Sequence, residues 1–84
     1  MDNSDTLKKK ILYRSNYRGT KELDILLSSF VKKYIDDLSY EELIDLNNFL
    51  SIEDEKIYNF YQNNILSPEI KKNKILILFK EFKI

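Results

Sequence analysis

The stretch TKELDILLSSFVKKYI, residues 20–35, decides the fold of this chain. Its apolar residues recur at intervals of three and four, which places them on one side of an α-helix. Thr20 is suited to cap the helix, because its hydroxyl can accept a hydrogen bond from a first-turn backbone N–H. We therefore predict an amphipathic helix that begins after Thr20 and ends near Ile35. Its inward side consists of Leu23, Leu26, Leu27, Phe30, Val31 and Tyr34.

The only glycine of the chain, Gly19, directly precedes this stretch. Glycine is favoured just past a helix end, where the backbone takes a positive φ that a side chain disfavours. We therefore predict an earlier helix over about 6–17, with Gly19 as its stop signal. Residues 1–5 are polar and terminal, and we expect them to be frayed.

Two more helices are predicted after residue 35. Ser39 and Glu42 are spaced as a capping box, in which each side chain bonds the other residue's backbone N–H. The helix that they begin buries Leu43, Leu46, Phe49 and Leu50. A short helix over about 55–63 follows, with Asp54 as its cap and with Ile57, Phe60 and Tyr61 inward.

A fifth helix is predicted to begin at Ser67-Pro68-Glu69, because serine caps helices and proline suits the first helical position. Its packed side would consist of Ile70, Leu76, Phe79 and Phe82. Residues 75–79 are continuously apolar and fit a buried strand as well. We favour a helix, since no second strand is predicted to pair with this one. The expected fold is all-α, a compact bundle of about five short helices in one domain over residues 1–84.

The composition excludes several kinds of site. The chain has 84 residues with no cysteine and no histidine. A disulfide, a metal site built from His and Cys, and a Ser-His or Cys-His catalytic pair are all impossible. We therefore expect no catalytic residue, no metal ligand and no enzymatic activity.

Charge is balanced overall but separated along the chain. Residues 7–21 carry six basic groups and no acid, whereas residues 36–55 carry eight acids and no base. Such segregation suits docking onto a partner of complementary charge, and two merely solvated faces explain it equally well. No apolar run approaches the roughly 20 residues of a membrane-spanning helix, and no signal peptide is recognisable. We expect an intracellular protein that does not insert into membranes.

Residues 11–24, ILYRSNYRGTKELD, resemble the SdhE family of succinate dehydrogenase flavinylation factors. The family motif is Arg-Gly-x-x-Glu, usually followed by Leu-Asp, and the chain has it at Arg18, Gly19 and Glu22. Residues 38–43 resemble the start of the family's next helix. Residues 57–60 resemble a later Leu-Tyr-x-Trp segment, with Phe60 in place of the tryptophan. The resemblance covers about residues 7–63.

The resemblance implies a five-helix factor that binds the flavoprotein subunit of succinate dehydrogenase, and sometimes that of fumarate reductase. The factor would promote covalent attachment of FAD to a histidine of that subunit. It would hold no cofactor stably itself, because the FAD belongs to the partner. The resemblance also implies a protein-binding site at Arg18, Gly19 and Glu22. The nearby Tyr13, Arg14 and Tyr17 are interface candidates by residue type, and Tyr13 fits a place in the core equally well. We expect a monomer in the bacterial cytoplasm, with the mitochondrial matrix as the second choice.

Other interpretations of the same residues remain open. Arg18 and Glu22 would simply pair with each other, and Gly19 would only stop a helix, if the motif were structural. A protein-interaction adaptor on the same fold would serve a different client. A nucleic-acid-binding regulator would use the basic first helix, although the zero net charge argues against it.

Overall fold

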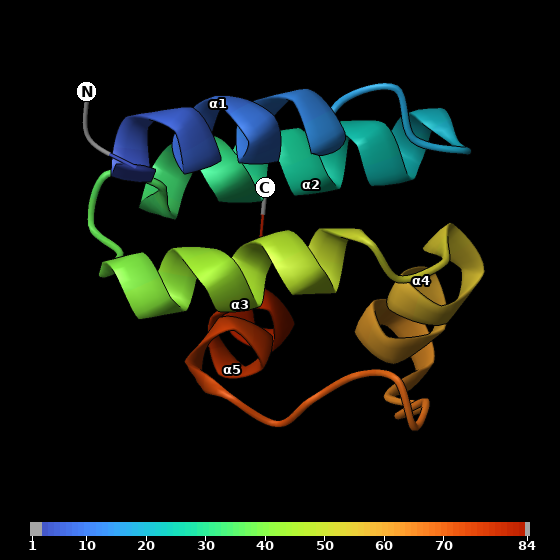
Figure 1. The fold of residues 1–84 in the computed structure, drawn as a ribbon. Helices are drawn as coiled ribbons and strands as arrows, with labels where there is room; N and C mark the ends of the chain where they lie inside the picture. Colours follow the sequence, from blue (N-terminus) through green and yellow to red (C-terminus); the bar gives the residue numbers. More distant parts are fainter. Residues whose placement is uncertain (1–2, 84) are drawn as a thin grey trace.

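The computed structural model describes residues 3–83, and all regular structure in that range is helical. This confirms the predicted all-α fold of five helices (Figure 1). The helices are α1 (Asn3–Arg14), α2 (Lys21–Tyr34), α3 (Tyr40–Leu50), α4 (Asp54–Asn63) and α5 (Lys74–Glu81).

The helices form two layers with one helix across the end. Figure 1 shows α1 and α2 side by side and antiparallel, with α3 running below them and α5 behind α3. The main contacts join α1 to α3, and smaller ones join α3 to α5, α1 to α2 and α4 to α5. α4 lies at the end of the molecule where the loop between α1 and α2 turns (Figure 1). This arrangement brings the single glycine next to the start of α4.

The core consists mostly of the apolar residues that the helical spacing predicted, together with Ile35 and Ile75, whereas Tyr34 and Tyr61 are only partly buried. Phe79 of α5 lies at the centre of an aromatic cluster, with its ring centroid 5.2 Å from that of Phe30, 5.1 Å from Phe49 and 5.1 Å from Tyr61. Aromatic pairs at these distances add to the energy of simple burial. Buried side chains from every helix surround this cluster, so the helices share one core.

The predicted starts of α2 and α3 are confirmed in detail. The N–H of Leu23 donates to the hydroxyl of Thr20 at 3.1 Å. At α3 the N–H of Glu42 donates to Ser39 Oγ at 3.2 Å, and the N–H of Ser39 donates to Glu42 Oε1 at 2.8 Å. Both caps satisfy N–H groups that the first turn of a helix leaves without backbone partners.

The first helix differs from the prediction at both ends. It ends at Arg14 rather than Tyr17, and the residue with a left-handed backbone is Tyr17, with φ of 60°, not Gly19. Ser15 ends the helix because its hydroxyl donates to the carbonyl of Leu12 at 2.8 Å, a local bond that competes with helix continuation. Of the residues expected to be frayed, 3–5 form the first turn of α1 and 1–2 lie outside the described residues.

The last helix begins later than predicted. Ser67 and Ile70 are joined by a turn, in which the Ile70 N–H donates to the Ser67 carbonyl at 3.0 Å. This turn allows Ile70 to be buried in the core at 4% exposure. The helix starts after Asn73, whose side chain accepts from the Leu76 N–H at 3.1 Å. The prediction of a helix start at Ser67 is therefore wrong, whereas the choice of helix over strand for residues 75–79 is confirmed.

Candidate docking corner

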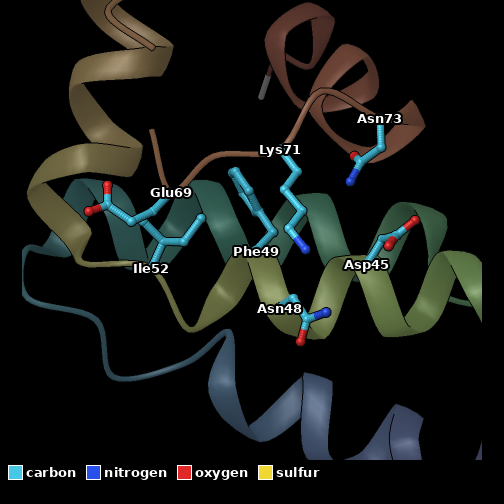
Figure 2. A pocket seen from close by; sticks show the side chains of 7 residues that line it. All are labelled: Asp45, Asn48, Phe49, Ile52, Glu69, Lys71 and Asn73. Carbon is cyan, nitrogen blue, oxygen red and sulfur yellow. The ribbon is translucent and has the colours of Figure 1, made fainter. Parts of the chain in front are cut away.

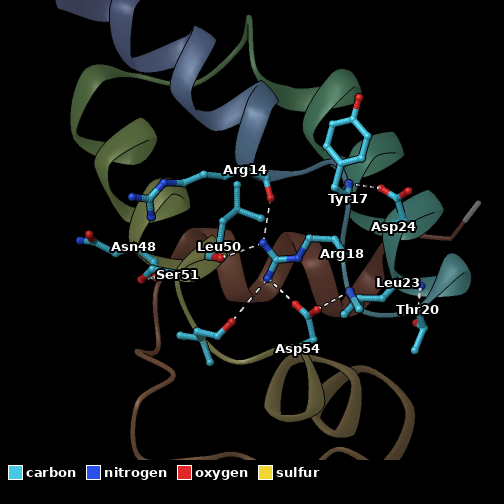
Figure 3. Close-up of polar contacts among 12 residues, drawn as sticks. Arg14, Tyr17, Arg18, Thr20, Leu23, Asp24, Asn48, Leu50, Ser51 and Asp54 are labelled. Atoms are coloured by element: carbon cyan, nitrogen blue, oxygen red, sulfur yellow. Dashed lines mark hydrogen bonds and ion pairs between the residues drawn. The ribbon is translucent and has the colours of Figure 1, made fainter.

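The side chain of Arg18 is directed into the protein and is only 11% exposed. Its Nη1 donates to the carbonyl of Arg14 at 2.8 Å and to that of Leu50 at 3.0 Å. Its Nη2 donates to the carbonyl of Ile52 at 3.4 Å and lies 2.6 Å from Asp54 Oδ1 (Figure 3). The carbonyls at the end of α1 and α3 have no helical partner, and a cation is stabilised there. Arg18 therefore fastens three segments together, and the interpretation that it pairs with Glu22 is wrong.

Asp54 connects Arg18 to the glycine. One carboxylate oxygen faces Arg18, and the other accepts a hydrogen bond from the Gly19 N–H at 2.5 Å. A Cβ atom on Gly19 would lie 2.8 Å from that second oxygen, closer than carbon and oxygen approach. The glycine thus lets Asp54 approach closely, and a side chain here would make the Asp54 carboxylate shift. Gly19 does not have a positive φ. Asp54 was predicted to cap α4, and that prediction is wrong because the helix starts after Glu53, which makes no side-chain cap bond.

Tyr17 and Tyr13 both point away from the protein. Their exposed fractions are 86% and 74%, so neither belongs to the core. The backbone N–H of Tyr17 donates to Asp24 Oδ1 at 3.0 Å, which ties the loop to the first turn of α2 (Figure 3). Arg14 is half-buried on the last turn of α1.

Glu22 is exposed in the first turn of α2, where the helix dipole stabilises its charge. The hydroxyl of Tyr58 on α4 donates to Glu22 Oε2 at 3.1 Å. This bond to a carboxylate raises the pKa of Tyr58 above its usual value. A groove runs between the starts of α2 and α4, lined by Gly19, Thr20, Glu22 and Tyr58 among others.

Five of the six residues predicted to bind a partner therefore lie wholly or partly at the surface around one turn of the chain. We call them the docking corner: Tyr13, Arg14, Tyr17, Gly19 and Glu22. The sixth, Arg18, fixes the corner from inside. Sequence reasoning missed the three residues that hold it, Asp24, Asp54 and Tyr58. Asp24 follows the motif directly, but nothing in the sequence pairs the motif with residues on α4.

A small cavity lies on the side of α3 that faces residues 69–73 (Figure 2). Asp45, Asn48 and Phe49 of α3 line it together with Lys71, and its volume is about 50 Å³. Cofactor sites enclose several hundred cubic ångströms, so this cavity is too small for a flavin. Within residues 3–83 no group of three or more acidic side chains is placed to hold a metal ion.

A helix that spans a bilayer needs roughly 20 predominantly apolar residues. In the described part of the chain, no helix has both the length and the apolar character needed to span a membrane.

Comparison with known proteins places the chain in a family. Residues 9–83 match the model of a family described as Sdh5, flavinator of succinate dehydrogenase. The chain is 33% identical over 75 residues to an FAD assembly factor SdhE of Acetobacter pasteurianus, covering 89% of this chain and 69% of that protein. It is also similar to mitochondrial succinate dehydrogenase assembly factor 2 of two yeasts. With Komagataella phaffii the identity is 32%, over 95% of this chain and 44% of the relative. With Debaryomyces hansenii it is 36%, over 92% of this chain and 57% of the relative.

No solved structure matches the chain. The family match covers nearly the whole sequence and includes the Arg-Gly-x-x-Glu motif, which confirms the resemblance inferred from residues 11–24. The chain therefore belongs to the Sdh5 family, the flavinators of succinate dehydrogenase.

Proposed function

We propose that this chain binds the flavoprotein subunit of succinate dehydrogenase and promotes covalent attachment of FAD to a histidine of that subunit. The family and the names of the bacterial and mitochondrial relatives support this function. The chain spans 69% of the bacterial relative but only about half of the two yeast relatives. The related fumarate reductase subunit is a second client under the same proposal.

The chain acts as a binding factor and not as an enzyme in this proposal. It has no histidine or cysteine, so the histidine that bonds to the flavin has to come from the partner. A factor that binds one conformation of the partner more tightly than others increases the population of that conformation. If that conformation aligns histidine and flavin, covalent attachment is faster, and the FAD remains with the partner throughout.

The docking corner is the surface that we propose for this contact, with Tyr13, Arg14, Tyr17, Gly19 and Glu22 facing the flavoprotein. The observation that carries the proposal is that several contacts from within the chain hold the motif in place. Arg18 and Gly19 are bonded to Asp54, and Glu22 is bonded to Tyr58. A surface that is already fixed loses less conformational entropy on binding, which favours tight association. Arg18 contributes by fixing the corner.

The test is reconstitution of flavin attachment with purified flavoprotein subunit, FAD and this chain. Covalent flavin would be followed by its fluorescence after denaturing gel electrophoresis. We expect Glu22→Gln to slow attachment about tenfold, which corresponds to about 1.4 kcal/mol of lost contact. Gly19→Arg would slow it at least as much, because the new side chain both displaces Asp54 and blocks the surface.

Glu41→Gln is the matched control, because Glu41 is also an exposed glutamate in the first turn of a helix, α3. We expect wild-type rates with this variant. Equal attachment rates with the wild type, Gly19→Arg and Glu22→Gln would contradict the proposed function.

We also propose that the free chain is a monomer and that it works in the bacterial cytoplasm, with the mitochondrial matrix as the alternative. The relatives include both a bacterial and several mitochondrial proteins. Sedimentation equilibrium and cell fractionation would test the two statements. A stable dimer or a membrane-fraction location would contradict them.

A further inference from the structure

Tyr17 has a backbone conformation that is unusual for its residue type. Its φ is 60°, in the left-handed region, which bulky residues rarely adopt. Within residues 3–83, the other non-glycine residue with positive φ is Asn64, which ends α4. Asparagine tolerates this region and is common at helix ends, so Asn64 needs no further explanation. The left-handed conformation of Tyr17 does need an explanation, because bulky residues rarely adopt it.

The strain at Tyr17 is not compensated by packing of its own ring. The side chain is 86% exposed, so it gains little from burial within the chain. The backbone is held instead by neighbours on both sides: the N–H of Tyr17 bonds Asp24, and the next residue, Arg18, is anchored by Asp54. Conformations held against strain are concentrated at binding sites, where they present a group in advance of the ligand.

The surroundings of Tyr17 indicate what kind of surface the ring would meet. Tyr13, one turn earlier, is also highly exposed, and the cations Lys10 and Lys21 are exposed nearby in the sequence. Residues 7–21 contain no acid. Tyrosine contributes a large contact area with only two side-chain torsions to fix, which makes it an effective anchor. The charges around the ring are mixed, because Glu22 and Asp24 follow in the first turn of α2. The arrangement fits an apolar pocket.

We propose that Tyr17 is an anchor whose ring enters an apolar pocket of the flavoprotein subunit, and that Asp24 is the residue that positions it. This inference rests on the proposed function and adds to it the chemistry of the partner's surface. It also assigns Asp24 a role that its place in the sequence does not indicate.

The experiment measures the affinity of purified flavoprotein subunit for variants of the full chain, together with the thermal unfolding of each free variant. Tyr17→Asn keeps a residue that accepts the left-handed conformation but removes the ring. We expect its affinity to fall at least about tenfold, while its unfolding temperature stays equal to the wild type or rises. Tyr17→Phe retains the ring and should bind within about twofold of the wild type.

Tyr40→Asn is the matched control, since Tyr40 is an exposed tyrosine on α3 with 46% exposure and no positive φ. We expect no change in its affinity. An unchanged affinity of Tyr17→Asn, or an equal loss with Tyr40→Asn, would overturn the anchor.

The positioning role of Asp24 is tested by combining variants. Asp24→Ala should weaken binding in the wild-type background but have no further effect on binding in the Tyr17→Asn background, because the ring that it positions is gone. Equal losses in both backgrounds would show that Asp24 acts independently of the ring.

The two proposals fail in distinguishable ways. If Glu22→Gln and Gly19→Arg weaken binding but Tyr17→Asn does not, the anchor is wrong and the proposed function stands. If the wild-type chain does not bind the flavoprotein subunit, both are wrong.

Discussion

At the scale of single residues, the ion pair of Arg18 and Asp54 is the shortest and the least exposed among the ion pairs of residues 3–83. The guanidinium is 11% exposed and the carboxylate 32% exposed, so the pair is largely shielded from water. Removing one member of such a pair leaves the other charge buried without compensation. Asp54 is partly exposed, so water can reach the site and partly solvate the charge that is left unpaired. This reduces the energetic cost of removing one member.

We predict that Asp54→Ala lowers the free energy of unfolding by about 2 kcal/mol, which lowers the melting temperature by roughly 10 °C. Glu55→Ala is the control, since Glu55 is the neighbouring acid in the same first turn of α4 and has the same interaction with the helix dipole. It should change stability by about 0.5 kcal/mol or less. Urea unfolding of both variants measures the difference, and equal effects would mean that the Arg18 contact contributes nothing.

The sequence predicted the residues of the docking corner but not how they are held. Arg18 was expected to offer its planar fork to a partner, and the fork is instead occupied by the chain's own carbonyls and by Asp54. Gly19 was expected to have a positive φ, and Tyr17 has it instead. The reason is distance along the chain, because Leu50 and Asp54 are more than thirty residues from the motif. Backbone carbonyls carry no residue type, so nothing in the sequence marks them as partners.

At the scale of helices, the capping residues predicted from the sequence made the expected hydrogen bonds where no other interaction of the same residues competed. The caps at Thr20 and Ser39 formed as predicted. At Ser67 the same kind of signal failed, because a turn there buries Ile70 and the Ser67 hydroxyl bonds Glu69. Burial of a large apolar side chain outweighs one helix cap.

Asn73, the observed cap of α5, and Ser67, the predicted cap, can be compared directly by mutation. We predict that Asn73→Ala destabilises the protein by about 1 kcal/mol, since the Leu76 N–H loses its acceptor. Ser67→Ala should cost about 0.5 kcal/mol or less, because Ser67 caps no helix. Chemical denaturation of the two variants decides between these caps. A larger loss of stability at Ser67 would support the predicted helix start at Ser67.

The capping box of α3 also makes stability depend on pH. The backbone of Ser39 and the ammonium of Lys74 at 3.0 Å hold the pKa of Glu42 below its usual value of 4.5. A carboxyl with a lowered pKa in the folded state stabilises the protein above its unfolded pKa, and this contribution is lost as pH falls through the folded value.

We therefore predict that Glu42→Gln lowers the melting temperature at pH 7 and that the difference from the wild type shrinks as the pH falls below about 4.5. Glutamine retains the bond to the Ser39 backbone, so the variant isolates the effect of charge. Melting curves collected from pH 7 to pH 3 test this. A difference that does not change with pH would show that the charge of Glu42 is irrelevant.

At the scale of the whole molecule, hydrophobic spacing predicted nearly all of the core, because one buried side per helix is a local pattern. Hydrophobic spacing did not predict that α1 packs mainly against α3. The periodicity shows which side of a helix is buried, but not which helix packs against that side. The aromatic cluster around Phe79 joins α2, α3, α4 and α5. A domain of this size has few such contacts to lose.

We predict that Phe79→Ala lowers the free energy of unfolding by about 4 kcal/mol, which is a large share of the total for so small a domain. Ile77→Ala, two residues earlier on the same helix, should cost about 0.5 kcal/mol or less, because Ile77 is 61% exposed. Far-ultraviolet circular dichroism during urea unfolding measures both. Similar losses would imply that α5 packs through a different side.

The position of Asp54 and Tyr58 on α4 limits how the corner can be imitated. Both lie more than thirty residues beyond the motif segment whose shape they determine. A synthetic peptide that copies residues 11–24 would contain every side chain of the surface but none of the contacts from α4. If the corner binds the flavoprotein as proposed, such a peptide would be a poor competitor, and an inhibitor designed to mimic this surface would have to include the start of α4.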